Sequence, residues 1–168
     1  TRDMMHDDDY STAFFSESER FFHNRMNGVL AQYNGKRNSY VEFVCDWEGM
    51  YSTLSREKFR ILLAGRHYLD TFYYGFNYSM FHYAGQQGAP IENVVDLQLL
   101  NPCVGVRFNA FFDFDIKLGA LLTAQRDRSF GHSWEKPCMG EFAFRISRWG
   151  LSLDERLYVG DNIHPFFY

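Results

Sequence analysis

The sequence predicts an all-β protein, an antiparallel up-and-down arrangement of long strands preceded by a short N-terminal helix. Residues 111–126 alternate apolar and polar side chains at a period of two, which is the pattern of a β-strand. This run exceeds the roughly 5–6 residues of an ordinary strand and reaches the roughly 9–11 that a strand needs to cross a bilayer. Aromatic residues make up 19% of the chain, and aromatics favour strands and line membrane barrels.

Composition narrows the classes of protein that this chain can belong to. Its 168 residues suffice for one domain, and a net charge of -4 gives no basic surface for nucleic acid. No apolar run approaches the roughly 18 residues of a membrane helix, so a membrane-spanning helix is not expected. A membrane barrel is not excluded in this way, because its strands alternate apolar and polar residues and contain no long apolar run. The three cysteines lack a C-x-x-C spacing, which argues against zinc and against a disulfide framework. No phosphate loop or nucleophile elbow occurs, so we expect no metal and no cofactor.

Residues 1–28 form a polar segment that precedes the strands. Ser16 and Glu19 match a capping box, which predicts a short helix over residues 17–27. The run from His6 to Asp9 could hold a hard cation. Because its acids are not spaced as ligands, a solvated loop is the better interpretation, and the role of the run stays open.

The strands expected in the barrel domain, residues 29–168, are 29–33, 39–49, 58–69, 72–85, 94–108, 111–126, 138–148 and 151–160. Pro102 interrupts the fifth of these, and we interpret it as a bulge or a strand entry because proline cannot donate to a ladder. Short breaks near 34–38, 69–72, 109–111 and 149–150 alternate with longer ones near 50–57, 85–93 and 127–137. Outer-membrane barrels alternate short turns and longer loops in this manner.

The two faces of the strands differ in character, which raises the question of which face meets water. One face is apolar and aromatic and includes Phe72, Tyr74, Phe76, Tyr78, Phe112, Phe114, Ile116, Leu118, Phe142 and Phe144. The other carries both signs of charge, on Glu42, Asp46, Glu48, Lys58, Arg60, Arg66, Arg107, Asp113, Asp115, Lys117, Glu141 and Arg145. The large aromatics would overpack a small barrel interior, so we expect about 8–10 strands with the apolar face toward lipid. The charges then form a salt-bridged lumen.

Three segments resemble a family of bacterial outer-membrane β-barrel proteins that has no assigned function. They are RFFHNRMNG (20–28), AGRHYLDTFYYGFNYSMFHYAG (64–85) and LYVGDNIHPFFY (157–168). The resemblance implies a transmembrane barrel in the outer membrane of a Gram-negative bacterium. It also implies strands beyond the last of these segments, so that the barrel would be incomplete at its C-terminal end.

The function expected from these patterns is a structural or accessory role in a larger envelope complex, with membrane lipid as a partner and no catalysis. One alternative is a membrane-embedded lipid-modifying enzyme, for which His67 and His82 are the candidate residues. The other alternative is a soluble carbohydrate-binding β-sandwich, in which exposed loop aromatics would stack on sugar rings. Its candidate aromatics are Tyr51, Phe130 and Trp134. The paired carboxylates Asp113 and Asp115 suit a salt-bridge network better than acid–base chemistry, because cations lie close to them in the same hairpin.

Overall fold

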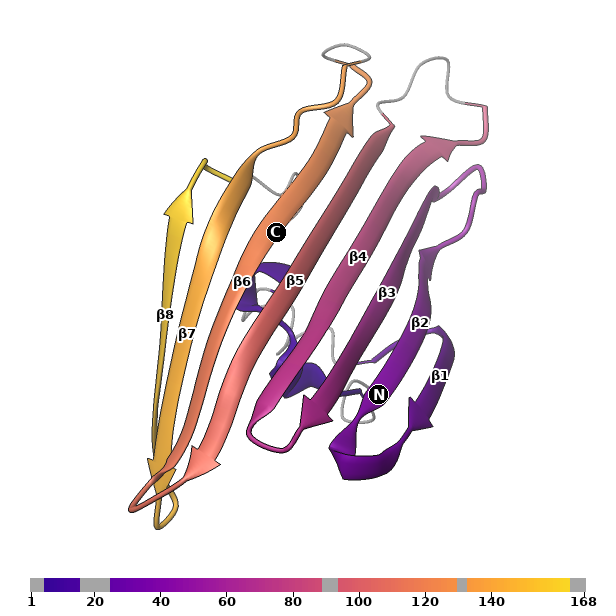
Figure 1. The fold of residues 1–168 in the computed structure, drawn as a ribbon. Coiled ribbons are helices and arrows are strands. Elements are labelled where there is room, and N and C mark those ends of the chain that lie inside the picture. The colour runs from indigo at the N-terminus through magenta and orange to yellow at the C-terminus, as the bar shows by residue number, and fades with distance from the viewer. Residues whose placement is uncertain (1–4, 16–24, 89–93, 130–132, 164–168) are drawn as a thin grey trace.

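The computed structural model describes residues 5–15, 25–88, 94–129 and 133–163, and these form an all-β protein. Eight strands lie in one sheet in sequence order, and each is antiparallel to its neighbour (Figure 1). They are β1 (Gly28–Asn34), β2 (Tyr40–Gly49), β3 (Arg56–Leu69), β4 (Phe72–Gln86), β5 (Val95–Asn109), β6 (Asp113–Asp127), β7 (Cys138–Arg148) and β8 (Leu151–Gly160). The predicted all-β, up-and-down topology is therefore confirmed, with every expected strand in place.

The strand connections divide into two kinds, one at each end of the sheet. Short turns join β3 to β4, β5 to β6 and β7 to β8 at the lower end in Figure 1, and longer loops lie at the upper end. The last of these turns has Trp149 and Gly150 at φ of 53° and 80°. Two central residues with positive φ twist a two-residue hairpin in the same sense as its strands. The lower end is called the turn end below, and the upper end the loop end.

Pro102 lies in the middle of β5, where the sequence had suggested a bulge or a strand entry. It is opposite Phe76 of β4 in an unbroken register. The side-chain amide of Asn101 donates to the carbonyl of Ala120 on β6 at 3.1 Å. A side chain next to the proline thus supplies a hydrogen bond to the neighbouring strand, which compensates for the donor that proline lacks.

Helical structure is scarce in this chain. The helix expected over residues 17–27 falls largely outside the described residues, and residues 25–27 are not helical. The described helices are single 3₁₀ turns, η2 (Asp7–Asp9), η3 (Thr12–Phe14) and η4 (Lys36–Asn38). None of the helices in the described ranges is long and apolar enough to cross a membrane.

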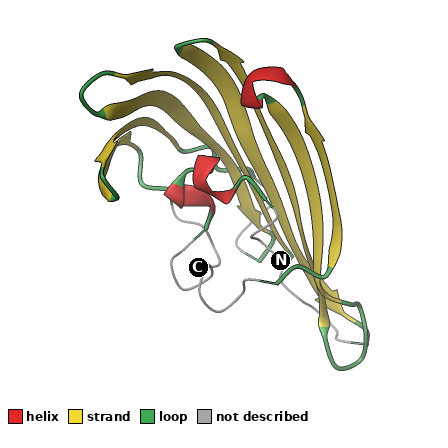
Figure 2. Ribbon diagram, turned by 90° about the horizontal axis from the view of Figure 1, so that it is seen from below, coloured by secondary structure: helices red, strands yellow, loops and turns green. Residues whose placement is uncertain are grey.

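The sheet curves, and the N-terminal segment lies in its concavity (Figure 2). Tyr10, Phe14 and Phe15 of this segment are almost wholly buried against the sheet, in contact with a cluster that includes Val44 and Leu121. The strand order is linear, so β1 and β8 are the two edges, and the described strands do not close on themselves as the expected barrel would. The inner face and the N-terminal segment together form the core.

Candidate functional site

The two faces of the sheet are buried to very different degrees. On the convex face, the predicted apolar residues Phe72, Tyr74, Phe76, Leu118 and Phe142 are exposed, and Tyr78, Phe112, Phe114, Ile116 and Phe144 are half-buried. On the concave face, six of the predicted charged residues are buried, Glu42, Asp46, Arg60, Arg66, Lys117 and Glu141. Large apolar side chains thus face outward and charged side chains face inward, the reverse of an ordinary soluble protein.

The other charged residues of the predicted network lie nearer the ends of the strands. Glu48, Lys58 and Asp115 are half-buried, and Arg107, Asp113 and Arg145 are exposed. Lys58 forms an ion pair with Glu48, and Arg107 contacts Asp115 through two nitrogens at 2.9 and 2.5 Å. Arg145 pairs with Asp154 of β8 at 2.6 Å. Asp113 accepts a hydrogen bond from Asn109 at the turn end.

Glu141 is a fully enclosed charge on the inner face, with a side chain that is 0% exposed. The Nζ atom of Lys117 lies 3.2 Å from its carboxylate, and the amide of Asn101 donates to the same oxygen at 3.1 Å. The hydroxyl of Tyr158 donates to the second oxygen at 3.2 Å. A cation and two neutral donors therefore satisfy this buried carboxylate, as a charge removed from water requires.

The N-terminal segment is held against the inner face by polar contacts to both sides of the sheet. Asp9 pairs with Arg66 of β3 at 2.5 Å, and the hydroxyl of Tyr10 donates to Glu42 of β2 at 3.1 Å. At the other side, Thr12 is hydrogen-bonded to Tyr158 of β8 at 2.6 Å. Residues 5–15 therefore span the concavity from the β2–β3 side to the β8 side.

The His6–Asp9 run, whose role the sequence left open, forms part of these contacts. The His6 ring stacks on Tyr40 at 3.6 Å between centroids and is hydrogen-bonded to Asn34 at 3.2 Å. Its backbone N–H donates to Glu42. The described part of the run thus tethers the N-terminal segment to β1, β2 and β3.

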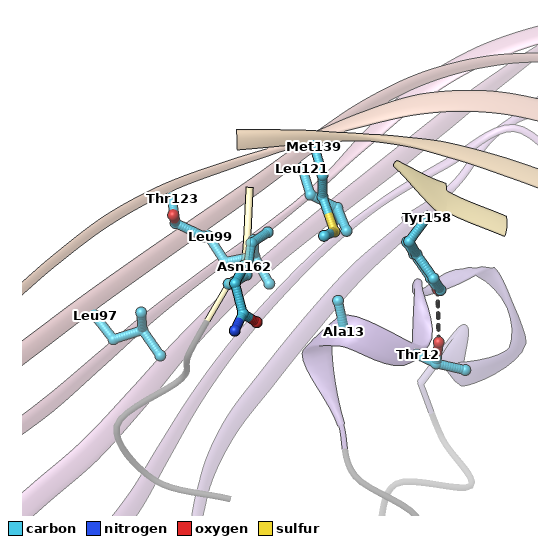
Figure 3. Close-up of a pocket in the computed structure, with 10 residues that line it drawn as sticks. Thr12, Ala13, Leu97, Leu99, Leu121, Thr123, Met139, Tyr158 and Asn162 are labelled. Atoms are coloured by element: carbon cyan, nitrogen blue, oxygen red, sulfur yellow. Dashed lines mark hydrogen bonds between the residues drawn. The ribbon is translucent and has the colours of Figure 1, made fainter. Parts of the chain in front are cut away.

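A mostly apolar cavity of about 320 Å³ lies between the N-terminal segment and the parts of β5, β6 and β7 toward the loop end (Figure 3). Its walls include Leu97, Leu99, Leu121 and Met139 from the sheet and Ala13 from the segment. The hydrogen-bonded pair of Thr12 and Tyr158 lies at one side of it. On β5, β6 and β7 the inner face is thus mostly apolar around this cavity, and ion pairs such as Arg107–Asp115 lie toward the turn end.

A row of side chains crosses the outer face near the loop end, and we call it the rim row. It consists of Trp47, Phe59, His82, Asp96, Arg126 and Trp134. The first five lie on five successive strands and are opposite one another in register. Trp47 stacks on Phe59 at 5.2 Å between centroids, and Phe59 contacts the ring of His82 at 5.1 Å.

The charged half of the rim row is centred on Asp96. His82 Nδ1 lies 2.7 Å from one carboxylate oxygen, and Arg126 and Arg128 approach the other at 2.5 and 3.2 Å. The guanidinium of Arg126 also lies 4.5 Å from the ring centre of Trp134. A carboxylate with two guanidinium partners therefore sits on a face that is otherwise largely apolar.

The candidate residues of the two alternative functions have structural partners where they are described. His67 contacts the ring of Tyr74, and His82 belongs to the rim row. Tyr51 is exposed, Trp134 contacts Arg126, and Phe130 lies outside the described residues.

Sequence reasoning had named His82 as a candidate residue but had not found its acidic partner. Asp96 falls on the apolar parity of its strand, as does Arg126 at the end of the next one. The signal in the sequence that could have indicated this cluster was the presence of charged residues at the ends of otherwise apolar strand faces. A long loop joins β4 to β5, so turn geometry could not supply the register that brings His82 and Asp96 together.

Comparisons of the chain with protein-family models, with curated proteins and with solved structures gave no match.

Proposed function

We propose that this protein is a transmembrane β-barrel of a bacterial outer membrane, with a structural or accessory role in the envelope. The observation that carries the proposal is the inverted distribution of side chains between the two faces. Leu118 is 56% exposed on the outer face of β6, whereas its neighbour Lys117 is buried on the inner face. Lipid as the outer solvent accounts for both facts, because barrel strands alternate apolar-out and polar-in.

The height of the outer apolar face fits a bilayer. Along β6 the outward residues between Phe114 and Arg126 are Ile116, Leu118, Ala120, Leu122 and Ala124. The strand advances about 40 Å between those two ends. At the 35–45° tilt of membrane strands this corresponds to a height of about 28–33 Å, close to the roughly 30 Å of a hydrocarbon core. Glu155 of β8, an edge strand, is a charged residue within this face.

Aromatic residues lie at both limits of this apolar band. At the turn end Phe108 stacks on Phe114 at 4.9 Å, and Phe111 contacts Trp149 at 5.9 Å. At the loop end the aromatic residues are Trp47, Phe59 and Trp134 of the rim row. Two aromatic girdles flanking an apolar band are typical of membrane barrels, since amphipathic rings favour the headgroup level.

The filled interior favours a structural or accessory role over a channel. Residues 5–15 occupy the concavity, and ion pairs such as Lys117–Glu141 join neighbouring strands across the inner face. A small barrel has an interior that side chains alone nearly fill, so a segment inside it leaves little room for a water path. The expected conductance is therefore negligible, and a binding or scaffolding role in the membrane is the better match.

Refolding from urea tests the membrane assignment. The urea-unfolded chain is diluted into buffer alone or into vesicles of short-chain phosphatidylcholine, and folding is followed by circular dichroism and by heat-modifiable migration on gels. We expect β-structure and heat-modifiable migration in vesicles and aggregation in buffer. A monodisperse β-sheet protein in buffer without lipid or detergent would contradict the proposal.

A further inference from the structure

We propose that His82, Arg126 and Arg128 form an outward-facing binding site for the phosphate group of a membrane lipid. The site rests on the proposed function, because it needs this face of the sheet to meet lipid. Its elements are one carboxylate, Asp96, and three nitrogen-bearing side chains that approach it. With His82 neutral the cluster carries a net charge of +1, since two guanidinium groups share a single carboxylate.

The position of the cluster at the edge of the apolar band indicates which ligand it would meet. In register it continues the row that begins with Trp47 and Phe59, at the loop-end limit of the apolar band. Lipid phosphates lie at that level of a bilayer, directly outside the hydrocarbon. Basic clusters next to the hydrocarbon attract anionic headgroups in this way.

The shape of the cluster suits an oxyanion. Arg126 is held by Asp96 on one side and by the ring of Trp134 at 4.5 Å on the other, with a side chain that is 19% exposed. Arg128 is more open to the surroundings, with a side chain that is 42% exposed. Each guanidinium has five N–H donors, so each keeps donors for a phosphate after contacting Asp96.

A membrane lipid is the better ligand than a soluble anion because of what surrounds the cluster. The outward neighbours toward the middle of the band are Met80 of β4, Leu122 and Ala124 of β6, and Gln98 of β5. Three of these four are apolar and can lie along an acyl chain below the phosphate. A soluble anion would gain nothing from them, whereas a lipid would contact both the cluster and the apolar band.

Binding to the detergent-solubilised full chain tests the site. The probe is dioctanoyl phosphatidic acid in maltoside micelles, followed by fluorescence of a W47F/W149F variant that keeps Trp134. Loss of both guanidinium groups in R126Q/R128Q should weaken binding by about 30-fold, from about 1 kcal/mol for each charge. The matched control is R145Q/R156Q, in which the two removed groups share Asp154 on the inner face at 2.6 and 3.4 Å, and there we expect less than a twofold change.

The outcomes separate the site from the function on which it rests. Tight binding of the probe, with weak binding of dioctanoylglycerol and of inorganic phosphate, supports a lipid phosphate site. Unchanged binding to R126Q/R128Q in protein that still inserts into vesicles overturns the site and leaves the barrel intact. Equally tight binding of inorganic phosphate also overturns it, in favour of a soluble anion. A wild-type chain that stays soluble without lipid overturns the barrel and the lipid site together.

Discussion

The buried pair of Lys117 and Glu141 provides a quantitative test of the enclosed interior. Replacing Lys117 with Met removes the only cation within 4 Å of Glu141 among the described residues, at 3.2 Å, and leaves a carboxylate that is 0% exposed. Breaking a buried ion pair by removing one partner costs about 3–5 kcal/mol, because the remaining charge stays out of water. Asn101 and Tyr158 still donate to this carboxylate, so we expect the lower part of that range.

The assay is urea unfolding of the vesicle-inserted protein, followed by tryptophan fluorescence. A double-mutant cycle with Glu141→Gln separates the pair from its surroundings. We expect the double variant K117M/E141Q to recover most of the loss, with a coupling free energy of at least about 2 kcal/mol. The recovery follows because neither charge then remains buried without a partner.

Arg145→Met is the control, because the Arg145–Asp154 pair also joins two neighbouring strands but has side chains that are 44% and 32% exposed. Exposed pairs contribute about 0–1 kcal/mol, so this variant should change the free energy of unfolding little. A loss below about 1 kcal/mol for K117M, equal to that of the control, would refute the reasoning. It would mean that water fills the inner face around Glu141.

Two further pairs of substitutions test the two faces by the same unfolding assay. A Cβ atom at Gly119 would lie 2.8 Å from Nδ2 of Asn101, so Gly119→Ala should destabilise by about 1–3 kcal/mol. At Gly140 the nearest atom would be 3.7 Å away, so Gly140→Ala should change stability by less than about 0.5 kcal/mol, and equal effects would contradict the crowded inner face. On the outer face, Leu118→Arg near the middle of the band should cost about 2–4 kcal/mol in vesicles and Leu151→Arg next to a turn about 0–1. A cost that does not depend on depth would argue against lipid there.

The sequence was sufficient to predict the strands, because a period-two pattern is a local signal. All eight expected ranges correspond to observed strands, and cross-strand partners such as Arg107 and Asp115 followed from the short turn between β5 and β6. Pro102 was not expected inside a central strand, because proline lacks the backbone donor that a strand uses. The Asn101 amide that compensates for this reaches a neighbouring strand. Local propensity carries no information about such a contact.

Contacts between distant segments were beyond prediction for a related reason. The N-terminal segment reaches β8 through the hydrogen bond between Thr12 and Tyr158, and nothing in either residue's neighbourhood marks the other. Its anchor Asp9 belongs to the His6–Asp9 run, which was interpreted as a solvated loop because acidic runs usually are. The apolar cavity was missed as well, since Leu97 and Leu99 lie on the parity of β5 that also carries Arg107, a charged residue of the inner face.

The central claim is that the apolar face of the sheet meets lipid. The most direct test is to measure which solvent two adjacent residues of one strand contact. In a background without the native cysteines Cys45, Cys103 and Cys138, spin labels are placed singly at Phe142 and Ala143 of β7 in vesicle-inserted protein. Collision rates with oxygen, which dissolves in lipid, and with a water-soluble nickel chelate are then compared. The proposed barrel predicts high oxygen and low nickel accessibility at residue 142, and low accessibility to both at residue 143. High nickel accessibility at residue 142 would place this face in water and contradict the account.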